Sequence, residues 1–275
     1  MEKFERLSAL YVKRLMPPNW RHFGDDVGDH WASLRLFLWG YAYERQGSSP
    51  DYSAVACDVM RELESKPFDE RAASTAWCKF EQKLNTKNTN PGLNPLCTNH
   101  TKYRWKDGVE KTTRKDSAVQ LALQLDKPIV AWARDAIASG DLKNVHAKLM
   151  EINGVGPKIA SLFLRDLAVW YNLVPTQDRQ LLQPIDTWEA FVASKMGGDG
   201  VPESRHDKCA SYIVDQSQKP EHANQGIWYF CTEVAFSSRY LVGRSLENQA
   251  YFDRLLRHHL HRLKAGAEAA DEFNG

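Results

Sequence analysis

The stretch Leu149–Phe163, with the sequence LMEINGVGPKIASLF, decides the fold prediction. Apolar residues recur at helical spacing on both sides of its centre, over Leu142–Ile152 and Ile159–Trp170, and predict two helices. The segment NGVGP between them, residues 153–157, contains two glycines that allow the backbone to turn sharply. Its proline suits the first position of the second helix. The stretch therefore predicts two helices joined by a tight hairpin.

The predicted hairpin has the properties of a phosphate-binding turn. Its exposed amides lie at the positive end of the second helix dipole, where backbone N–H groups bind an anion without side-chain charge. We expect Asn153, Gly154, Val155 and Gly156 to contact a nucleic-acid backbone in this way. Lys158, directly after the proline, adds one local cation. A chain whose formal net charge is only +1 can therefore still hold a phosphate.

The rest of the chain is also predicted to be helical. No segment alternates convincingly between apolar and polar residues, as a half-buried strand would. Apolar residues recur at helical spacing over Trp31–Glu44, Tyr52–Lys66, Glu70–Leu84, Ser117–Ala138 (with a break near Pro128) and Asn248–Lys264. The predicted fold class is all-α, and 275 residues suffice for one large domain or for two lobes that share a cleft.

Two adjoining segments before the hairpin are predicted to be irregular. The stretch Asn85–His100 is rich in Asn and contains two Pro, which favours turns and predicts an exposed loop. In the following KYRWKDG, residues 102–108, Lys102 and Arg104 alternate with aromatic residues that include Trp105. This composition suits contact with phosphates beside stacking on bases. A solvated, partly packed segment without a ligand explains the same composition.

The overall composition is that of an ordinary globular protein, with 43% hydrophobic and 26% charged residues. No stretch approaches the roughly 18 consecutive apolar residues of a membrane span. The N-terminal segment Met1–Asn19 mixes Glu, Lys and Arg into its apolar residues, unlike a targeting segment. We therefore expect a protein that stays in the cytosol and has no membrane partner.

No metal site is predicted. The five cysteines are widely spaced and include no C-x-x-C pair, so we expect reduced thiols and neither a zinc site nor an iron–sulfur cluster. His258, His259 and His261 lie close together in sequence, but His258 and His259 point about 100° apart on a helix. These histidines are predicted to belong to a basic, solvated helix face.

Downstream of the hairpin, the segment Pro184–Trp188 has the sequence PIDTW and places Asp186 before a predicted helix. Asp186 and Glu189 form a D-x-x-E pattern, in which each side chain caps the backbone N–H of the other residue. Such an N-cap contributes roughly 0.5–2 kcal/mol. Capping alone therefore explains an aspartate at this position.

Together the two motifs resemble the helix-hairpin-helix superfamily of DNA base-excision glycosylases, which includes the endonuclease III and 8-oxoguanine glycosylase families. LMEINGVGPKIASLF is similar to the superfamily hairpin and its following lysine, and PIDTW is similar to the downstream loop with the essential aspartate. Both occur in the expected order, within Leu142–Phe191. The resemblance implies two helical lobes flanking a DNA-binding cleft, and a catalytic pair formed by Lys158 and Asp186.

The resemblance also implies a mechanism. Lys158 would attack C1′ of a flipped nucleotide as a neutral amine, displace the damaged base and form a Schiff base that can break the strand. A helix N-terminus disfavours the ammonium form of such a lysine. Asp186 would stabilise oxocarbenium-like charge on the sugar and assist proton transfers. A solvated surface charge is the alternative explanation for Lys158.

The sequence departs from the superfamily around Asp186. Lys158 and Asp186 are 28 residues apart, because Tyr171–Gln183 inserts a polar segment. Trp188 stands where many members carry His, and Glu189 stands in the region where a basic residue is common. Contacts with phosphates near Asp186 are therefore expected to differ from those of the superfamily.

A glycosylase must extrude its target nucleotide and fill the gap that is left. Trp188, beside Asp186, and Trp105 are the candidate base-pocket residues, although packing in the core explains a tryptophan equally well. The loop Asn85–His100 is the candidate wedge, because small amides can enter the duplex and bond the orphaned base.

The resemblance implies a division of the chain into lobes. One helical lobe is expected over residues 30–165, ending in the helix-hairpin-helix at residues 142–170. Residues 1–29 and 166–264 are expected to form a second lobe that carries the Asp186 loop. Residues 265–275 are small and polar, and predict a flexible tail.

The expected function is that of a DNA glycosylase with AP lyase activity, acting on duplex DNA that contains a damaged or modified base, with an oxidised purine favoured. We expect a cytoplasmic, nucleoid-associated monomer that requires no cofactor, although the hairpin carbonyls suit a monovalent cation. Three alternatives stay open. They are a monofunctional glycosylase in which Asp186 activates water, a non-catalytic hairpin protein that clamps phosphate, and an all-α interaction module unrelated to DNA.

Overall fold

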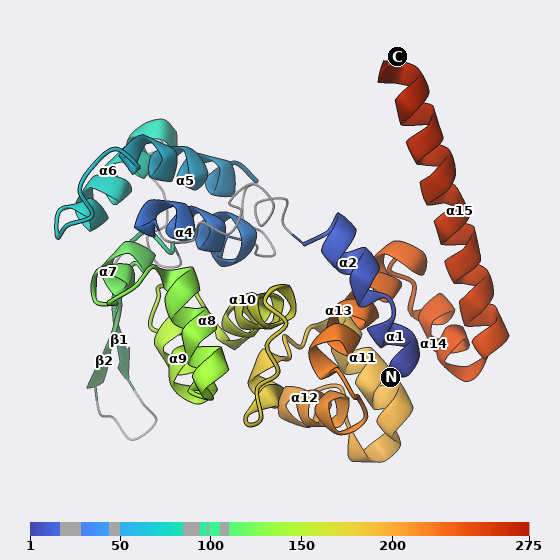
Figure 1. Cartoon of the computed structure of the whole chain (residues 1–275). Helices are drawn as coiled ribbons and strands as arrows, with labels where there is room; N and C mark the ends of the chain where they lie inside the picture. The colour runs from blue at the N-terminus through green and yellow to red at the C-terminus, as the bar shows by residue number, and fades with distance from the viewer. Residues whose placement is uncertain (17–28, 44–49, 85–93, 98, 105–109, 275) are drawn as a thin grey trace. The chain divides into compact units, whose positions relative to one another are not determined.

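The computed structural model describes residues 1–16, 29–43, 50–84, 94–97, 99–104 and 110–274, and these residues are mostly helical (Figure 1). The chain forms two compact units. The terminal unit comprises Met1–Leu15 and Ile185–Gly275, and the central unit comprises Met16–Pro184. The all-α prediction is therefore confirmed at the level of a mostly helical fold.

The central unit consists of helices and one short β-hairpin. Its elements are α4 (His30–Phe37), the π-helical turn η1 (Leu38–Ala42), α5 (Pro50–Leu63), α6 (Ala72–Leu84), β1 (Asn99–Arg104), β2 (Glu110–Lys115), α7 (Ala118–Leu123), α8 (Ile129–Ser139), α9 (Leu142–Leu149), α10 (Pro157–Trp170) and the 3-10 turn η3 (Arg179–Leu182). The helices predicted from apolar spacing are present, and the break near Pro128 separates α7 from α8.

The core of the central unit forms where α4 and η1 pack on α10. Phe163 of α10 makes edge-on contacts with Phe37 and Tyr41, with ring centroids 5.0 and 5.2 Å apart. The Tyr41 hydroxyl donates to the Asp166 carboxylate over 3.2 Å. Arg165 also donates two hydrogen bonds to Asp166, at 2.9 and 2.7 Å, and the pair is buried. Because both charges are paired, this polar group can lie inside the core and fix the position of α10.

The strands β1 and β2 form an antiparallel hairpin, with Thr101 opposite Thr113. This hairpin is a small exception to the nearly all-α fold that the sequence predicts. The sequences NHTKYR and EKTTRK contain few large apolar residues, so they lack the alternation that marks a half-buried strand. Their β-branched threonines favour extended backbone, and pairing between the strands supplies the hydrogen bonds.

Part of the predicted exposed loop Asn85–His100 is buried. Residues 85–93 and 98 lie outside the described residues, but Asn94 and Leu96 are 4% and 1% exposed. The Asn94 side chain accepts hydrogen bonds from the Tyr43 hydroxyl at 2.6 Å and from the Leu96 N–H at 3.0 Å. The expectation of an exposed loop was therefore wrong for residues 94–97, because a polar side chain can be buried once its hydrogen bonds are satisfied.

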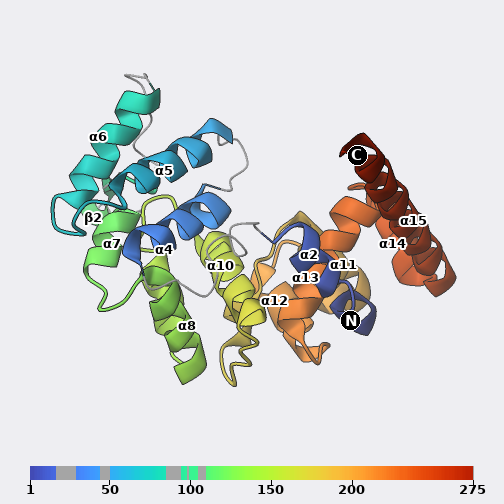
Figure 2. The same cartoon turned by 45° about the horizontal axis from the view of Figure 1, so that its top comes forward.

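The terminal unit joins both ends of the chain. Its elements are α1 (Glu2–Glu5), α2 (Ser8–Arg14), α11 (Thr187–Gly197), the 3-10 turn η4 (Gly198–Gly200), α12 (His206–Asp215), α13 (Pro220–Tyr229), the π-helical turn η5 (Phe230–Val234), α14 (Arg239–Glu247) and α15 (Gln249–Asn274). Figures 1 and 2 show α14 lying against the beginning of α15.

Aromatic rings from three distant segments form the core of the terminal unit. Phe230 and Phe252 stack with ring centroids 4.3 Å apart, and Phe4 meets both edge-on at 5.9 and 5.8 Å. The backbone of α1 approaches α13 so closely at Gly226 that a Cβ atom there would lie 1.8 Å from the Phe4 carbonyl oxygen. The N-terminal segment is therefore an integral part of this unit.

The observed units differ from the predicted lobes at their boundaries. The predicted boundary at residues 165 and 166 falls inside α10, and a continuous helix keeps both residues in the central unit. The predicted flexible tail, residues 265–275, is helical backbone as far as Asn274. Ala and Glu, which are good helix formers, make up most of this segment, and α15 continues through it. Among the described helices, none combines the length and the apolar character needed to cross a membrane.

Candidate functional site

The turn between α9 and α10 is built as the glycines and proline predict. Gly154 has a φ of 78°, which a residue with a side chain rarely adopts. Gly156 occupies the N-cap position with extended backbone, and Pro157 is the first residue of α10. No side chain of the described residues caps this helix, which leaves its N-terminal amides available to water or to a ligand.

Hydrogen bonds inside the central unit hold this turn in place. His146 of α9 bonds Ser161 of α10 over 3.1 Å, and both are buried. Burial lowers the pKa of His146, and a hydrogen bond with the Pro157 carbonyl opposes this in part. Below the turn, the Asp116 N–H donates to Glu151 over 3.0 Å, and the Lys115 ammonium donates to the Met150 carbonyl. The end of β2 therefore fixes the end of α9.

Asn153 forms hydrogen bonds inside the central unit. Its side chain is 2% exposed and donates to the carbonyls of Asn94 and Cys97 over 3.0 and 3.1 Å. Its backbone N–H donates to Asp116 over 2.8 Å. The side chain and the N–H of Asn153 therefore serve the turn itself, because a turn that leaves the helix must satisfy its buried polar groups internally. The predicted contact of Asn153 with nucleic acid stays a prediction.

Gly154 and Gly156 have the N–H groups of this turn that are available for a phosphate. Val155 is 5% exposed and its N–H donates to Ile152 over 3.0 Å, so it also serves the turn. The N–H groups of Gly154 and Gly156 have no partner among the described residues, and both glycines are partly exposed. Lys158, the second residue of α10, is exposed beside them. These groups lie together at one end of α10.

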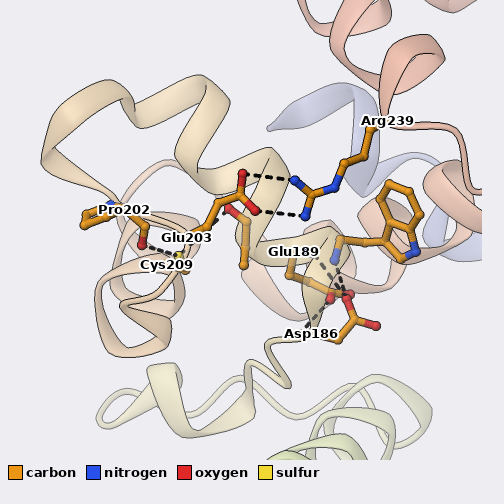
Figure 3. A network of polar contacts seen from close by, with 8 residues as sticks. Asp186, Glu189, Pro202, Glu203, Cys209 and Arg239 are labelled. Atoms are coloured by element: carbon orange, nitrogen blue, oxygen red, sulfur yellow. Dashed lines mark hydrogen bonds and ion pairs between the residues drawn. The ribbon is translucent and has the colours of Figure 1, made fainter. Parts of the chain in front are cut away.

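Asp186 is the N-cap residue of α11 in the terminal unit. Its Oδ1 accepts hydrogen bonds from the Trp188 and Glu189 N–H groups at 2.6 and 3.4 Å, and its own N–H donates to Glu189 at 3.1 Å (Figure 3). The predicted capping box is therefore confirmed. Asp186 remains partly exposed while it caps the helix.

The carboxyl group of Glu189 is buried beside the partly exposed carboxylate of Asp186. It is 1% exposed, and burial raises its pKa well above the usual value, with further increases from the Asp186 charge and from a side-chain hydrogen bond with Asp186. Burial and the same two carboxyl groups also raise the pKa of the nearby Cys231 thiol. Glu189 is therefore held in its protonated form at a pH where an ordinary glutamate is ionised.

This carboxyl group should make the stability of the protein depend on pH. A carboxyl group with a raised pKa in the folded state favours folding fully below its unfolded pKa of about 4.3, and this contribution is lost as the pH rises through the folded pKa. Glu189→Gln keeps an oxygen acceptor without the titration. We expect urea unfolding from pH 4 to pH 9 to show a smaller loss of stability for Glu189→Gln than for the wild type.

The matched control for this prediction is Glu247→Gln, because Glu247 is exposed on α14 of the same unit. That variant should lose stability with pH as the wild type does. Identical pH profiles for all three proteins would contradict the assignment of a protonated Glu189.

Trp188 lies at the partly exposed start of α11, as the base-pocket expectation requires. Its ring meets Phe191 edge-on, with centroids 6.5 Å apart. The Arg239 guanidinium lies over the Phe191 ring, 4.8 Å from its centroid. Arg239 also donates hydrogen bonds of 2.9 and 3.4 Å to the Glu203 carboxylate. Figure 3 shows this ion pair near Asp186 and Glu189. Sequence reasoning missed Arg239 and Glu203, since neither belongs to a local motif.

The other predicted site residues are only partly described. Lys102 and Arg104 belong to strand β1, but their side chains are not among those described. Trp105 lies outside the described residues, as does most of the candidate wedge loop. Their predicted contacts with DNA stay predictions.

Within the described part of the chain, no group of three or more His, Cys, Asp or Glu side chains is placed to hold a metal ion. The five cysteines are free thiols, as expected, and three of them are buried. Of the three histidines near the end of the chain, His258 and His261 are exposed, as predicted. His259 is instead buried and bonds the Tyr229 hydroxyl over 2.8 Å, because its position on α15 faces the core.

Comparison with known proteins gives little functional information. No family model and no solved structure matches the chain. An uncharacterized protein of Methanocaldococcus jannaschii is 27% identical over 206 residues, which cover 66% of this chain and 45% of the relative. The chain therefore spans less than half the length of this relative. The match assigns no activity, so the residues themselves must support any function.

Proposed function

We propose that this protein is a DNA glycosylase of the helix-hairpin-helix superfamily that removes a damaged or modified base from duplex DNA. The observation that carries the proposal is the end of α10, where two glycine N–H groups without partners among the described residues lie beside the exposed Lys158. An uncapped helix N-terminus with two glycine amides suits one DNA phosphate. With a phosphate held there, the exposed Lys158 would be the cation next to the adjoining nucleotide.

In the proposed reaction, Lys158 is the nucleophile. Its neutral amine attacks C1′ of the nucleotide, the glycosidic bond breaks, and the base departs with the bonding electron pair and gains a proton. The resulting aminal opens to a Schiff base, from which β-elimination cleaves the strand. Asp186 stabilises the positive charge that develops on the sugar while the base departs. An oxidised purine is the favoured base, because lysine-bearing members of the superfamily often act on it.

The arrangement of the two units, the oligomeric state and the cofactor requirement are proposed from the same resemblance. The two units would correspond to the two lobes of the superfamily, with α9 and α10 as its helix-hairpin-helix. The protein would act as a cytoplasmic monomer on duplex DNA and need no cofactor. The carbonyls of the hairpin are the groups that would hold a monovalent cation.

A second candidate function is a non-catalytic phosphate clamp. The complete capping box at Asp186 favours it, because capping gives this residue a structural role that needs no chemistry. In a clamp, the hairpin would bind duplex DNA and Lys158 would only add charge.

Release of a base distinguishes the two functions. Duplexes that carry 8-oxoguanine, an oxidised pyrimidine or uracil are incubated with the protein, and the released base is measured by mass spectrometry. We expect release from at least one duplex and none from an undamaged control. Binding to duplex DNA without release from any substrate would support the clamp, and a monofunctional glycosylase would release the base and leave the strand intact.

A further inference from the structure

The positive charge of the terminal unit is concentrated in α14 and in the part of α15 up to Lys264, ahead of the acidic residues Glu268, Asp271 and Glu272 near the end of that helix. Between Arg239 and Lys264 the chain has six Lys and Arg and only two acidic residues, so this stretch carries a formal charge of +4 with neutral histidines. The whole chain carries +1, which leaves −3 for all other residues. A charge this local creates a field over one surface of the protein rather than over all of it.

Aromatic side chains are exposed in α14, in the turn before it and at the start of α15. Phe236, in the turn before α14, is 51% exposed, and Tyr240, in the first turn of α14, is 69% exposed. Tyr251, near the start of α15, is partly exposed. Two highly exposed rings within five residues contribute little to the core, so packing does not explain them.

The backbone that presents Phe236 is strained. Phe236 and Ser237 have φ values of 52° and 55°, so two consecutive residues with side chains adopt the left-handed region. Residues with side chains rarely adopt this region, and they persist there only where the surrounding structure holds them. The Ser237 N–H donates to Cys231 over 2.8 Å and the Ser238 hydroxyl caps α14, and these bonds hold the turn. The result of this strain is an aromatic ring directed to solvent.

Arginine side chains lie against these rings. The guanidinium carbon of Arg262 is 4.9 Å from the centroid of Phe236. Those of Arg244 and Arg254 are 4.5 and 4.9 Å from the centroid of Tyr251. Arg244 also donates to the Tyr240 hydroxyl over 3.4 Å, which connects the rings of α14 and α15. We call the set the basic–aromatic surface, which comprises Phe236, Tyr240, Arg244, Tyr251, Arg254 and Arg262.

The arginines of this surface have no acidic partner among the side chains that the structure describes. Arg244, Arg254 and Arg262 are exposed, and none of them forms an ion pair with an acidic side chain of the described residues. Arg239 differs, because Glu203 holds it through two hydrogen bonds. Three arginines without acidic partners and three rings on one surface fit a ligand that is both anionic and aromatic.

We propose that the basic–aromatic surface binds single-stranded nucleic acid. Phe236 and Tyr240 would stack on unpaired bases, and Arg244, Arg254 and Arg262 would contact the phosphates between them. Single strands offer base faces that a duplex conceals, which is why proteins that bind them combine exposed rings with basic residues. This site shares no residue with the hairpin and needs no base excision. It therefore goes beyond the proposed function and does not depend on it.

The proposal is tested with the full chain and a fluorescent oligothymidine, whose binding is followed by anisotropy at several salt concentrations. Arg254→Gln combined with Arg262→Gln should weaken binding at least about tenfold. It should also reduce the slope of log K against log salt by about 1.4, which is about 0.7 for each lost phosphate contact. The charge-matched control combines Lys208→Gln and Lys219→Gln, both exposed in the same unit, and should bind almost as the wild type does.

Stacking is tested by Phe236→Leu and Tyr240→Leu, which keep an apolar side chain and remove the ring. Each should weaken oligothymidine binding by roughly fivefold to a hundredfold, the range that the loss of one stacked base produces. Because both side chains are exposed, thermal unfolding should change little, and this measurement shows that each variant is folded.

Other outcomes would overturn the proposal. If the protein binds phosphatidylserine vesicles but not oligothymidine, and both leucine variants still bind the vesicles, the surface is a lipid site. If Lys158→Gln loses oligothymidine binding and the variant with Arg254→Gln and Arg262→Gln keeps it, the single strand binds at the hairpin. A failure to release bases, in contrast, would overturn the proposed enzyme and leave this surface untouched.

Discussion

Replacing Asp186 by Asn should reduce base excision at least about a hundredfold while the protein stays folded. Asn is as good an N-cap as Asp, so the variant keeps the hydrogen bonds from Trp188 and Glu189 at the start of α11. It removes the negative charge that the proposed mechanism places against the developing charge on the sugar. Loss of one electrostatic partner of a transition state costs about 10²–10³ in rate. Single-turnover release of the preferred base measures the excision rate. Circular dichroism and urea unfolding show whether the variant is folded.

The matched control is Asp29→Asn. Asp29 caps α4 in the same way, accepting a hydrogen bond from the Ala32 N–H over 2.7 Å, and it belongs to neither candidate motif. Its variant should keep both stability and activity. If Asp186→Asn is folded and excises bases at the wild-type rate, the aspartate only caps its helix.

Gly226→Ala should destabilise the terminal unit by about 3 kcal/mol or more. A Cβ atom at this position of α13 would lie 1.8 Å from the oxygen and 2.6 Å from the carbonyl carbon of Phe4. Both are backbone atoms of α1, so no side-chain rotation relieves the clash, and α1 must move away. Overpacked cores lose about 1–3 kcal/mol and sometimes more. Here the displacement also separates Phe4 from Phe230 and Phe252.

Gly243→Ala provides the control for this loss. Gly243 is also helical, but a Cβ atom there would have only Phe191 nearby, at an ordinary contact distance of 3.9 Å. Removing a helical glycine should stabilise this variant by about 0.5–1 kcal/mol. Urea unfolding followed by circular dichroism measures both variants. Equal effects of the two substitutions would contradict the close approach of α1 and α13.

Local patterns in the sequence predicted most of the helices and both candidate motifs. The turn between α9 and α10 follows from two glycines and a proline in five residues, and these act through their own backbone preferences. The capping box at Asp186 and Glu189 is also local, because its two side chains bond amides three residues away. Such features need no knowledge of the distant chain.

Features that depend on distant contacts could not be predicted. The Asn153 side chain is buried because it donates hydrogen bonds to Asn94 and Cys97, which are more than 50 residues away in the sequence. No pattern near residue 153 indicates these partners. The β-hairpin carries too few apolar residues to be recognised by alternation. Phe236 is a similar case, because a φ of 52° at a phenylalanine results from the bonds that close its turn.

The central claim is that Lys158 forms a covalent bond with the sugar of a damaged nucleotide. Borohydride trapping tests it directly, because reduction of the Schiff base leaves a stable bond between protein and DNA. We expect a trapped adduct with duplexes that carry an abasic site or the preferred damaged base, and no adduct with Lys158→Gln. An adduct of equal yield in Lys158→Gln, or released base without any adduct from the wild type, would contradict it.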